Sequence, residues 1–232
     1  MTRWLSLVAV ALLSSVGTAV AFTALDRKQD TRAYLLEHPE VLQEAMEKLR
    51  MKQAAAQIAP LRRDLETPFA QGFMGAPKGD VTIVQFFDYA CGYCRTSLAD
   101  LQRLVREDPK VRVVFREYPI LSRESETAAR ASLVAAQQGR YAAFHTAMYA
   151  AGRPSAAGVI RAAQTAGLDM TQLQTAMQAP DKEQELVNNV ALARTLGFSG
   201  TPSWVIGDQA MSGAVGYEAL KEAVAKVRAS RT

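Results

Sequence analysis

Cysteine and histidine are scarce in this 232-residue chain, which has only Cys91, Cys94, His38 and His145. A structural zinc site needs four ligands, and a Cys-x-x-Cys pair supplies only two of them. His38 lies in a separate helical segment ahead of the cysteines, so it is poorly placed to complete such a site. The composition therefore argues against structural zinc.

The chain also lacks internal repeats, low-complexity tracts and a glycine-rich phosphate loop. Its formal net charge is +4 and its pI is about 9.1, but the basic residues are scattered and form no stripe. The sequence therefore gives no indication of nucleic-acid binding. With 49% hydrophobic and 22% charged residues, the chain fits one globular domain with an appendage.

Charge is missing near the amino terminus, between Arg3 and Asp26. A basic start, an apolar run and the small-x-small triplet Ala19–Ala21 predict a signal peptide over residues 1–21. The uncharged span Trp4–Leu25 is also long enough to cross a bilayer, so an uncleaved anchor is the alternative. Either way we expect the folded part in the periplasm or otherwise outside the cytoplasm, soluble if the signal is cleaved.

The cysteine pair itself closes a loop of only four residues. Such a short loop removes little entropy from the unfolded chain, so a disulfide between Cys91 and Cys94 would add little stability. The spacing therefore favours a redox function over a structural staple.

The segments around the pair alternate between strand and helix patterns. Val81–Phe87 is a β-branched and aromatic run that predicts a buried strand. After Cys94, apolar residues recur at helical spacing until Asp108, and residues 111–115 predict a second strand. The predicted order is strand, Cys-Gly-Tyr-Cys, helix, strand.

This placement predicts how the two sulfurs divide the chemistry. The unpaired N–H groups and the positive end of the helix dipole favour a thiolate at Cys91, which we interpret as the nucleophile. Cys94, one helical turn later, can resolve a mixed disulfide and should be the more buried sulfur. Gly92 and Tyr93, between them, should tune the redox poise.

Three segments resemble the DsbA-like branch of the thioredoxin superfamily. They are Phe86-Phe87-Asp88-Tyr89-Ala90-Cys91-Gly92-Tyr93-Cys94, Phe115-Arg116-Glu117-Tyr118-Pro119-Ile120-Leu121 and Gly200-Thr201-Pro202-Ser203-Trp204-Val205-Ile206-Gly207. The resemblance implies an α/β, thioredoxin-like fold and a cis Thr201–Pro202 bond beside the cysteines. A substrate could then pair with the backbone of Thr201, and Tyr93, Thr201 and Pro202 are the candidate substrate-binding residues.

A long helical region separates the second segment from the third, and the DsbA-like branch carries an inserted helical subdomain at this point. We place the insertion at about 122–197 within a domain spanning 67–232. Predicted helices begin at Ser122 and Ser155 and end at Gly139 and Gly167. Further predicted elements are a capping box Asp169-x-x-Gln172, a helix over 181–197, hairpin strands around Val205 and Met211, and a closing helix over 217–227.

Four further residues have predicted secondary roles. Asp88 either caps the helix at Cys91 or tunes proton transfer, and we favour capping. Tyr89 and Tyr93 are predicted to line an apolar rim around the sulfurs. His145, among aromatic residues, is interpreted as a helix-packing residue.

Residues 22–66 predict an amino-terminal helical segment. Leu35, Leu42, Leu49 and Ala56 recur every seven positions, and a new helix should begin at Pro39, capped by His38. The apolar face must either fold back on the catalytic domain or meet another copy of the chain. Similar extensions in the ScsC branch of the DsbA-like proteins imply homo-oligomerisation, here through residues 30–66.

Together these features predict an exported protein thiol-disulfide oxidoreductase without organic cofactor or metal. We favour a disulfide isomerase or reductase acting on unfolded or misfolded exported proteins, supplied by a membrane redox partner similar to DsbB or DsbD. One alternative is a monomeric oxidase that introduces disulfides. The other is a tolerance protein that binds a soft metal such as Cu(I).

Overall fold

The computed structural model describes residues 31–231, so the predicted signal peptide lies outside the described residues. The chain forms two compact units that divide between Arg50 and Met51. The first contains a short helix over 31–37 and the start of α2 (Glu40–Glu66), which confirms that the helical register is broken at Pro39. No helix within residues 31–231 combines the length and apolarity needed to span a bilayer.

The second unit is built on a five-stranded mixed sheet. Its strands are β1 (Phe73–Gly75), β2 (Val81–Phe87), β3 (Val111–Glu117), β4 (Ser203–Ile206) and β5 (Gln209–Ser212), in the order β1-β3-β2-β4-β5. β2 and β3 are parallel, and the other neighbouring pairs are antiparallel. The predicted strands around the cysteines and the predicted hairpin are confirmed, whereas the three-residue β1 was not predicted.

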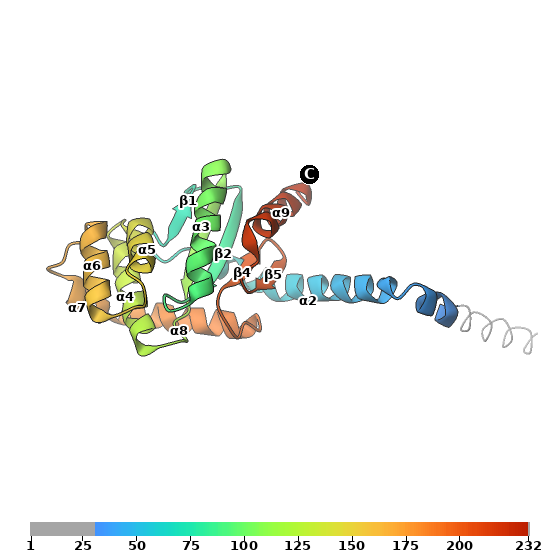
Figure 1. Cartoon of the computed structure of the whole chain (residues 1–232), viewed down its shortest axis with the longest axis horizontal. Helices are drawn as coiled ribbons and strands as arrows, with labels where there is room; N and C mark the ends of the chain where they lie inside the picture. Colours follow the sequence, from blue (N-terminus) through green and yellow to red (C-terminus); the bar gives the residue numbers. More distant parts are fainter. Residues whose placement is uncertain (1–30, 232) are drawn as a thin grey trace, which may run out of the picture. The chain divides into compact units, whose positions relative to one another are not determined.

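Helices surround this sheet. α3 (Gly92–Glu107) connects β2 to β3, and α9 (Gly216–Ala229) closes the chain. Between β3 and β4 lie α4 (Arg123–Gln137), α5 (Tyr141–Ala150), α6 (Ala156–Ala166), α7 (Leu173–Met177) and α8 (Pro180–Thr195). Figure 1 shows α4 to α7 grouped beside the sheet, with α3 passing in front of β2.

Helix boundaries in the insertion follow the predicted caps, with one exception. The hydroxyls of Ser122 and Ser155 accept N–H bonds at the starts of α4 and α6, and Gly139 and Gly167 have φ of +69° and +70° beyond their ends. The predicted capping box at Asp169 is wrong. Its carboxylate accepts the N–H of Thr171 in a local turn, and α7 begins without a side-chain cap.

Both faces of β2 are buried, which explains its continuous apolar run. Val81, Ile83 and Phe87 pack in one core cluster with α3, α9 and the insertion. Val84 and Phe86 pack on the other side with the end of α2 and with α8.

The end of α2 belongs to the second unit. Ile58 and Leu65 are fully buried in the cluster that contains Val84. The compact units therefore divide at residue 50, inside the segment 22–66 that the sequence suggested as a separate extension.

Candidate active site

The two cysteines open α3, and both are free thiols. Cys91 is the N-cap of the helix, and its Sγ accepts the N–H of Cys94 at 3.4 Å. Cys91 is 6% exposed and Cys94 1% exposed, so Cys94 is the more buried sulfur, as predicted. Burial raises the pKa of Cys94 far above its ordinary value. At rest, therefore, Cys94 remains a thiol, and Cys91 is the sulfur next to solvent.

The loop before β4 faces the cysteines. The thiol of Cys91 donates a hydrogen bond to the carbonyl oxygen of Thr201 at 3.3 Å. The Thr201–Pro202 peptide bond is cis, as predicted. The hydroxyl Oγ1 of Thr201 is buried and has no hydrogen-bond partner among residues 31–231. The structure thus brings together Cys91, Cys94, Thr201 and Pro202 from two segments far apart in the sequence.

Asp88 does not cap α3, because Cys91 occupies the N-cap position itself. The buried carboxylate of Asp88 instead accepts three backbone N–H bonds. Oδ1 binds Ala90 at 2.7 Å, and Oδ2 binds Ile120 and Leu121, both at 2.8 Å. The capping prediction is therefore wrong. The carboxylate links the turn before Cys91 to the loop that follows β3.

The predicted aromatic rim contains only one of its two tyrosines. Tyr93 is 70% exposed beside Cys91, whereas Tyr89 is buried in the core. Tyr89 lies two residues after Phe87, and their rings pack edge to face at 5.0 Å. The hydroxyl of Tyr89 is 3.0 Å from Nδ1 of His145. The prediction for Tyr89 is thus wrong, and the packing role predicted for His145 is confirmed.

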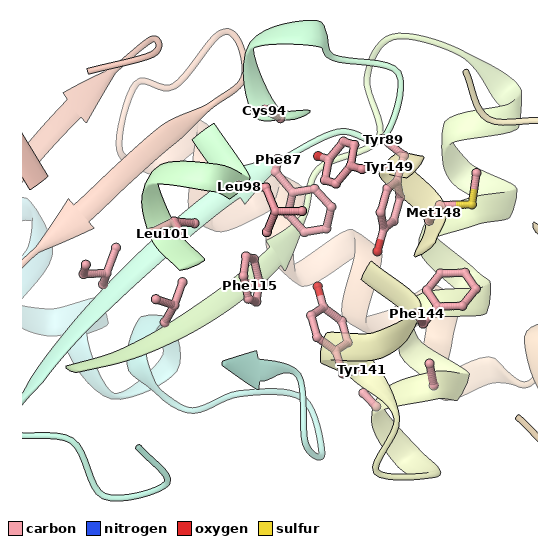
Figure 2. Packing of buried hydrophobic residues seen from close by; sticks show 14 of the residues in the cluster. Phe87, Tyr89, Cys94, Leu98, Leu101, Phe115, Tyr141, Phe144, Met148 and Tyr149 are labelled. Carbon is pink, nitrogen blue, oxygen red and sulfur yellow. The ribbon is translucent and has the colours of Figure 1, made fainter. Parts of the chain in front are cut away.

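A buried polar cluster lies deeper in the same core. Glu117, at the end of β3, accepts hydrogen bonds from the hydroxyls of Ser132 and Tyr141, the latter at 3.0 Å. Burial raises the pKa of Glu117 well above its usual value and lowers that of His145 to about 3. Figure 2 shows the hydroxyl of Tyr141 directed toward Tyr89 and Tyr149. Sequence reasoning missed Glu117, because its partners come from helices of the insertion.

A cysteine pair at the start of a helix, opposite a cis-proline peptide on a mixed sheet, defines the thioredoxin-like class of redox proteins. The family model for the DSBA-like thioredoxin domain matches residues 82–225, and the chain belongs to this family. A second model, the copper resistance protein ScsC N-terminal domain, matches residues 32–56. The predicted thioredoxin-like fold and the resemblance to DsbA-like and ScsC proteins are confirmed.

Two solved structures illustrate the similarity. A thioredoxin-like oxidoreductase from Silicibacter pomeroyi is 47% identical, with a TM-score of 0.67, and the alignment covers 71% of this chain and 95% of the other. A linker-deletion mutant of Proteus mirabilis ScsC is 28% identical, with a TM-score of 0.71, and the alignment covers 86% and 92% of the two chains.

A curated relative is much longer. The Na(+)/H(+) antiporter NhaA 3 of Salinispora tropica is 27% identical over 196 residues, which are 76% of this chain and 30% of that protein. The chain thus spans about a third or less of the curated relatives that it matches.

Metal ligands do not gather in the part of the chain that the structure describes. Within residues 31–231, no group of three or more His, Cys, Asp or Glu side chains is arranged to hold an ion.

Proposed function

We propose that this chain catalyses thiol-disulfide exchange on protein clients. The observation that carries the proposal is the position of the Cys91 sulfur between the first N–H groups of α3 and the carbonyl of Thr201. The thiolate form of Cys91 attacks a client disulfide to form a mixed disulfide and releases one client thiol. Cys94 then attacks Cys91, which releases the other client thiol and leaves the Cys91–Cys94 disulfide.

The backbone of Thr201 would hold the client during exchange. An extended client segment can pair with this backbone beside Cys91, with Pro202 fixing the loop and the exposed ring of Tyr93 on the rim. No organic cofactor or metal is needed, because the cysteine pair carries both electrons.

We further propose that the protein is an isomerase or reductase and acts as a homo-oligomer. On the first part of α2, Leu42, Met46 and Leu49 lie on one side of the helix and are each more than half exposed. The match to the ScsC amino-terminal model over residues 32–56 supports this view of the segment. Several redox sites around a shared space could hold one misfolded client while its disulfides are exchanged.

A location outside the cytoplasm accompanies this proposal. Unfolded exported proteins would be the clients, and a membrane protein similar to DsbB or DsbD would set the redox state of the pair. The similarity to a periplasmic thioredoxin-like protein of Salmonella enterica, at 27% identity, supports this location.

Two assays test the activity. The wild-type protein should reduce insulin and refold scrambled ribonuclease, and Cys91→Ser should do neither. A wild-type protein that lacks both activities but binds Cu(I) through the two thiols would replace the proposal with metal tolerance. Acid trapping of the thiols in intact cells separates the directions, since an isomerase keeps the pair reduced and an oxidase keeps it oxidised.

Light scattering tests the oligomer. The triple variant Leu42→Gln, Met46→Gln and Leu49→Gln should lower the molecular mass in solution to that of one chain. Glu47→Gln, on another side of the same helix, is the matched control and should leave the mass unchanged. A wild-type protein that is already monomeric would favour the oxidase alternative.

A further inference from the structure

Part of the exposed apolar surface of the second unit lies near the cysteines. Residues 51–231 expose six large hydrophobic side chains among those described: Met51, Tyr93, Ile120, Leu121, Ile160 and Val187. Tyr93 lies between the two cysteines, and Ile120 and Leu121 are 42% and 53% exposed in the loop after β3. Exposed apolar groups close together are typical of a surface that binds a partner.

The carboxylate of Asp88 fixes this loop next to the redox pair. One oxygen binds the N–H of Ala90, the residue before Cys91, and the other binds the N–H groups of Ile120 and Leu121. Hydrogen bonds to a buried carboxylate are strong and directional. The backbones of Ala90 and Ile120 are therefore separated only by the width of one carboxyl group.

The start of the loop is anchored as well. The N–H of Tyr118 donates to the carbonyl of Phe87 at 2.8 Å, which extends the parallel pairing of β2 and β3 by one step. The hydroxyl of Tyr118 donates to the carbonyl of Phe198 at 3.2 Å. The backbone of the loop is thus held at Tyr118 by Phe87 and at Ile120 and Leu121 by Asp88. This anchoring keeps the side chains of Ile120 and Leu121 exposed to solvent.

We propose that Ile120 and Leu121 contact an apolar client side chain beside the client cysteine, and that Asp88 is the positioning residue that holds them there. This inference rests on the proposed exchange activity and adds a substrate preference to it. The occupant is an apolar residue of an unfolded polypeptide, because such residues are exposed only while the client is misfolded. Asp88 acts on this preference through the loop and does not touch the client.

The test compares two peptides that differ at one residue. Each peptide carries one cysteine joined to glutathione by a disulfide, with leucine or serine next to the cysteine. The reduced protein attacks the peptide sulfur through Cys91 and releases glutathione. Cys94 then displaces the peptide, so two protein thiols become one disulfide, and their two electrons and two protons leave on the peptide thiol and glutathione.

The measured quantity is the ratio of kcat/KM for the leucine peptide to that for the serine peptide. We expect this ratio to be about five for the wild-type protein, because partial burial of one leucine side chain stabilises the complex with the leucine peptide. The double variant Ile120→Ser and Leu121→Ser should bring the ratio within about twofold of one, through a higher KM for the leucine peptide. Ile160→Ser, which changes an exposed apolar residue of α6, should keep the wild-type ratio.

Asp88→Asn tests the positioning role. An asparagine has the same shape, but its NH₂ group cannot accept hydrogen bonds from N–H donors. Part of the hydrogen bonding to Ala90, Ile120 and Leu121 is therefore lost. The peptide ratio should fall as in the double variant, and the thermal unfolding curve shows whether the fold is kept.

Two results overturn the inference. One is a double variant that retains the preference for the leucine peptide. This result decides the question even if Asp88→Asn does not fold. The other is a wild-type protein that reacts equally well with both peptides, which removes the preference but keeps the exchange activity. A wild-type protein that reacts with neither peptide removes the proposed function as well.

Discussion

The sulfur of Cys91 lies 3.3 Å from the carbonyl oxygen of Thr201, a residue 110 positions further along the chain. This contact joins the segment after β2 to the segment before β4, which are neighbours in the sheet. The pairing of β2 with β4 therefore brings Cys91 and Thr201 together, although five helices separate β3 from β4 in the sequence.

The first prediction concerns the division of labour between the sulfurs. Cys94→Ser should accumulate mixed disulfides between Cys91 and client proteins, because the buried resolving sulfur is gone. Cys91→Ser should form none. Acid quenching followed by non-reducing electrophoresis measures both. In the reduced wild-type protein, iodoacetamide at neutral pH should label Cys91 before Cys94, and preferential labelling of Cys94 would reverse the assignment.

The second prediction concerns Glu117. Its folded-state pKa lies well above the usual 4.5, so the folded protein keeps a proton that the unfolded chain releases as the pH rises past about 4.5. Glu117 thus lowers the free energy of unfolding as the pH rises from there toward its folded-state pKa. Glu117→Gln removes this loss of unfolding free energy, because glutamine does not ionise. Its amide oxygen can still accept the hydrogen bonds from the hydroxyls of Ser132 and Tyr141. The stability of the variant relative to wild type should rise by about 1.4 kcal/mol per pH unit over that window.

Urea unfolding at a series of pH values measures this difference. Glu124→Gln, which changes an exposed carboxylate in the first turn of α4, is the matched control and should give a nearly constant difference. A constant difference for Glu117→Gln would mean that Glu117 is ionised in the fold.

The third prediction concerns His145, whose pKa is lowered by burial from 6.5 to about 3. Between these values the unfolded chain binds a proton that the folded protein excludes. The stabilising effect of a neutral His145 is therefore complete above pH 6.5 and is lost as the pH falls toward 3. Relative to His145→Phe, the wild-type protein should lose about 1.4 kcal/mol of unfolding free energy per pH unit in this window.

Tyr89→Phe serves as the control for His145. It removes the same hydrogen bond of 3.0 Å but keeps the imidazole, so its pH dependence should follow the wild type. An unchanged pH dependence in His145→Phe would contradict the prediction.

The fourth prediction concerns the end of α2. Leu65 is fully buried in the cluster with Val84 and Phe86, so Leu65→Ala should lower the free energy of unfolding by about 2–5 kcal/mol. Met51→Ala, at an exposed position of the same helix, should change it by less than about 1 kcal/mol. If both variants had equally small effects, the end of α2 would not be packed against the sheet of the second unit.

The sequence predicted the parts of this molecule that depend on local signals. The strand Val81–Phe87, the helix that begins beside Cys91, and the caps at Ser122 and Ser155 all have neighbours in the chain as their determinants. The cis bond at Pro202 was implied by the family resemblance and is present. These features needed no knowledge of tertiary contacts.

The errors concern residues whose partners are distant. The carboxylate of Asp88 binds backbone N–H groups 32 and 33 residues later. Every residue except proline has a backbone N–H group, so the sequence does not indicate which ones a side chain will bind. Tyr89 was misplaced because the strand alternation that puts Phe87 in the core also applies two residues further on. The sequence left open whether residues 22–66 fold back on the rest of the chain, and the buried residues Ile58 and Leu65 lie on a different face of α2 from the seven-residue repeat.

The link from Cys91 to Thr201 has a consequence for the order in which the protein is made. Synthesis delivers Cys91 long before Thr201, the residue that carries its acceptor, has been made. During that interval the sheet lacks β4 and β5, and the thiol of Cys91 has no hydrogen bond to the carbonyl of Thr201. The thiol can then react with any oxidant that is present. The two cysteines reach their final surroundings only when the last two strands have joined the sheet, so until then the growing chain is itself open to thiol oxidation.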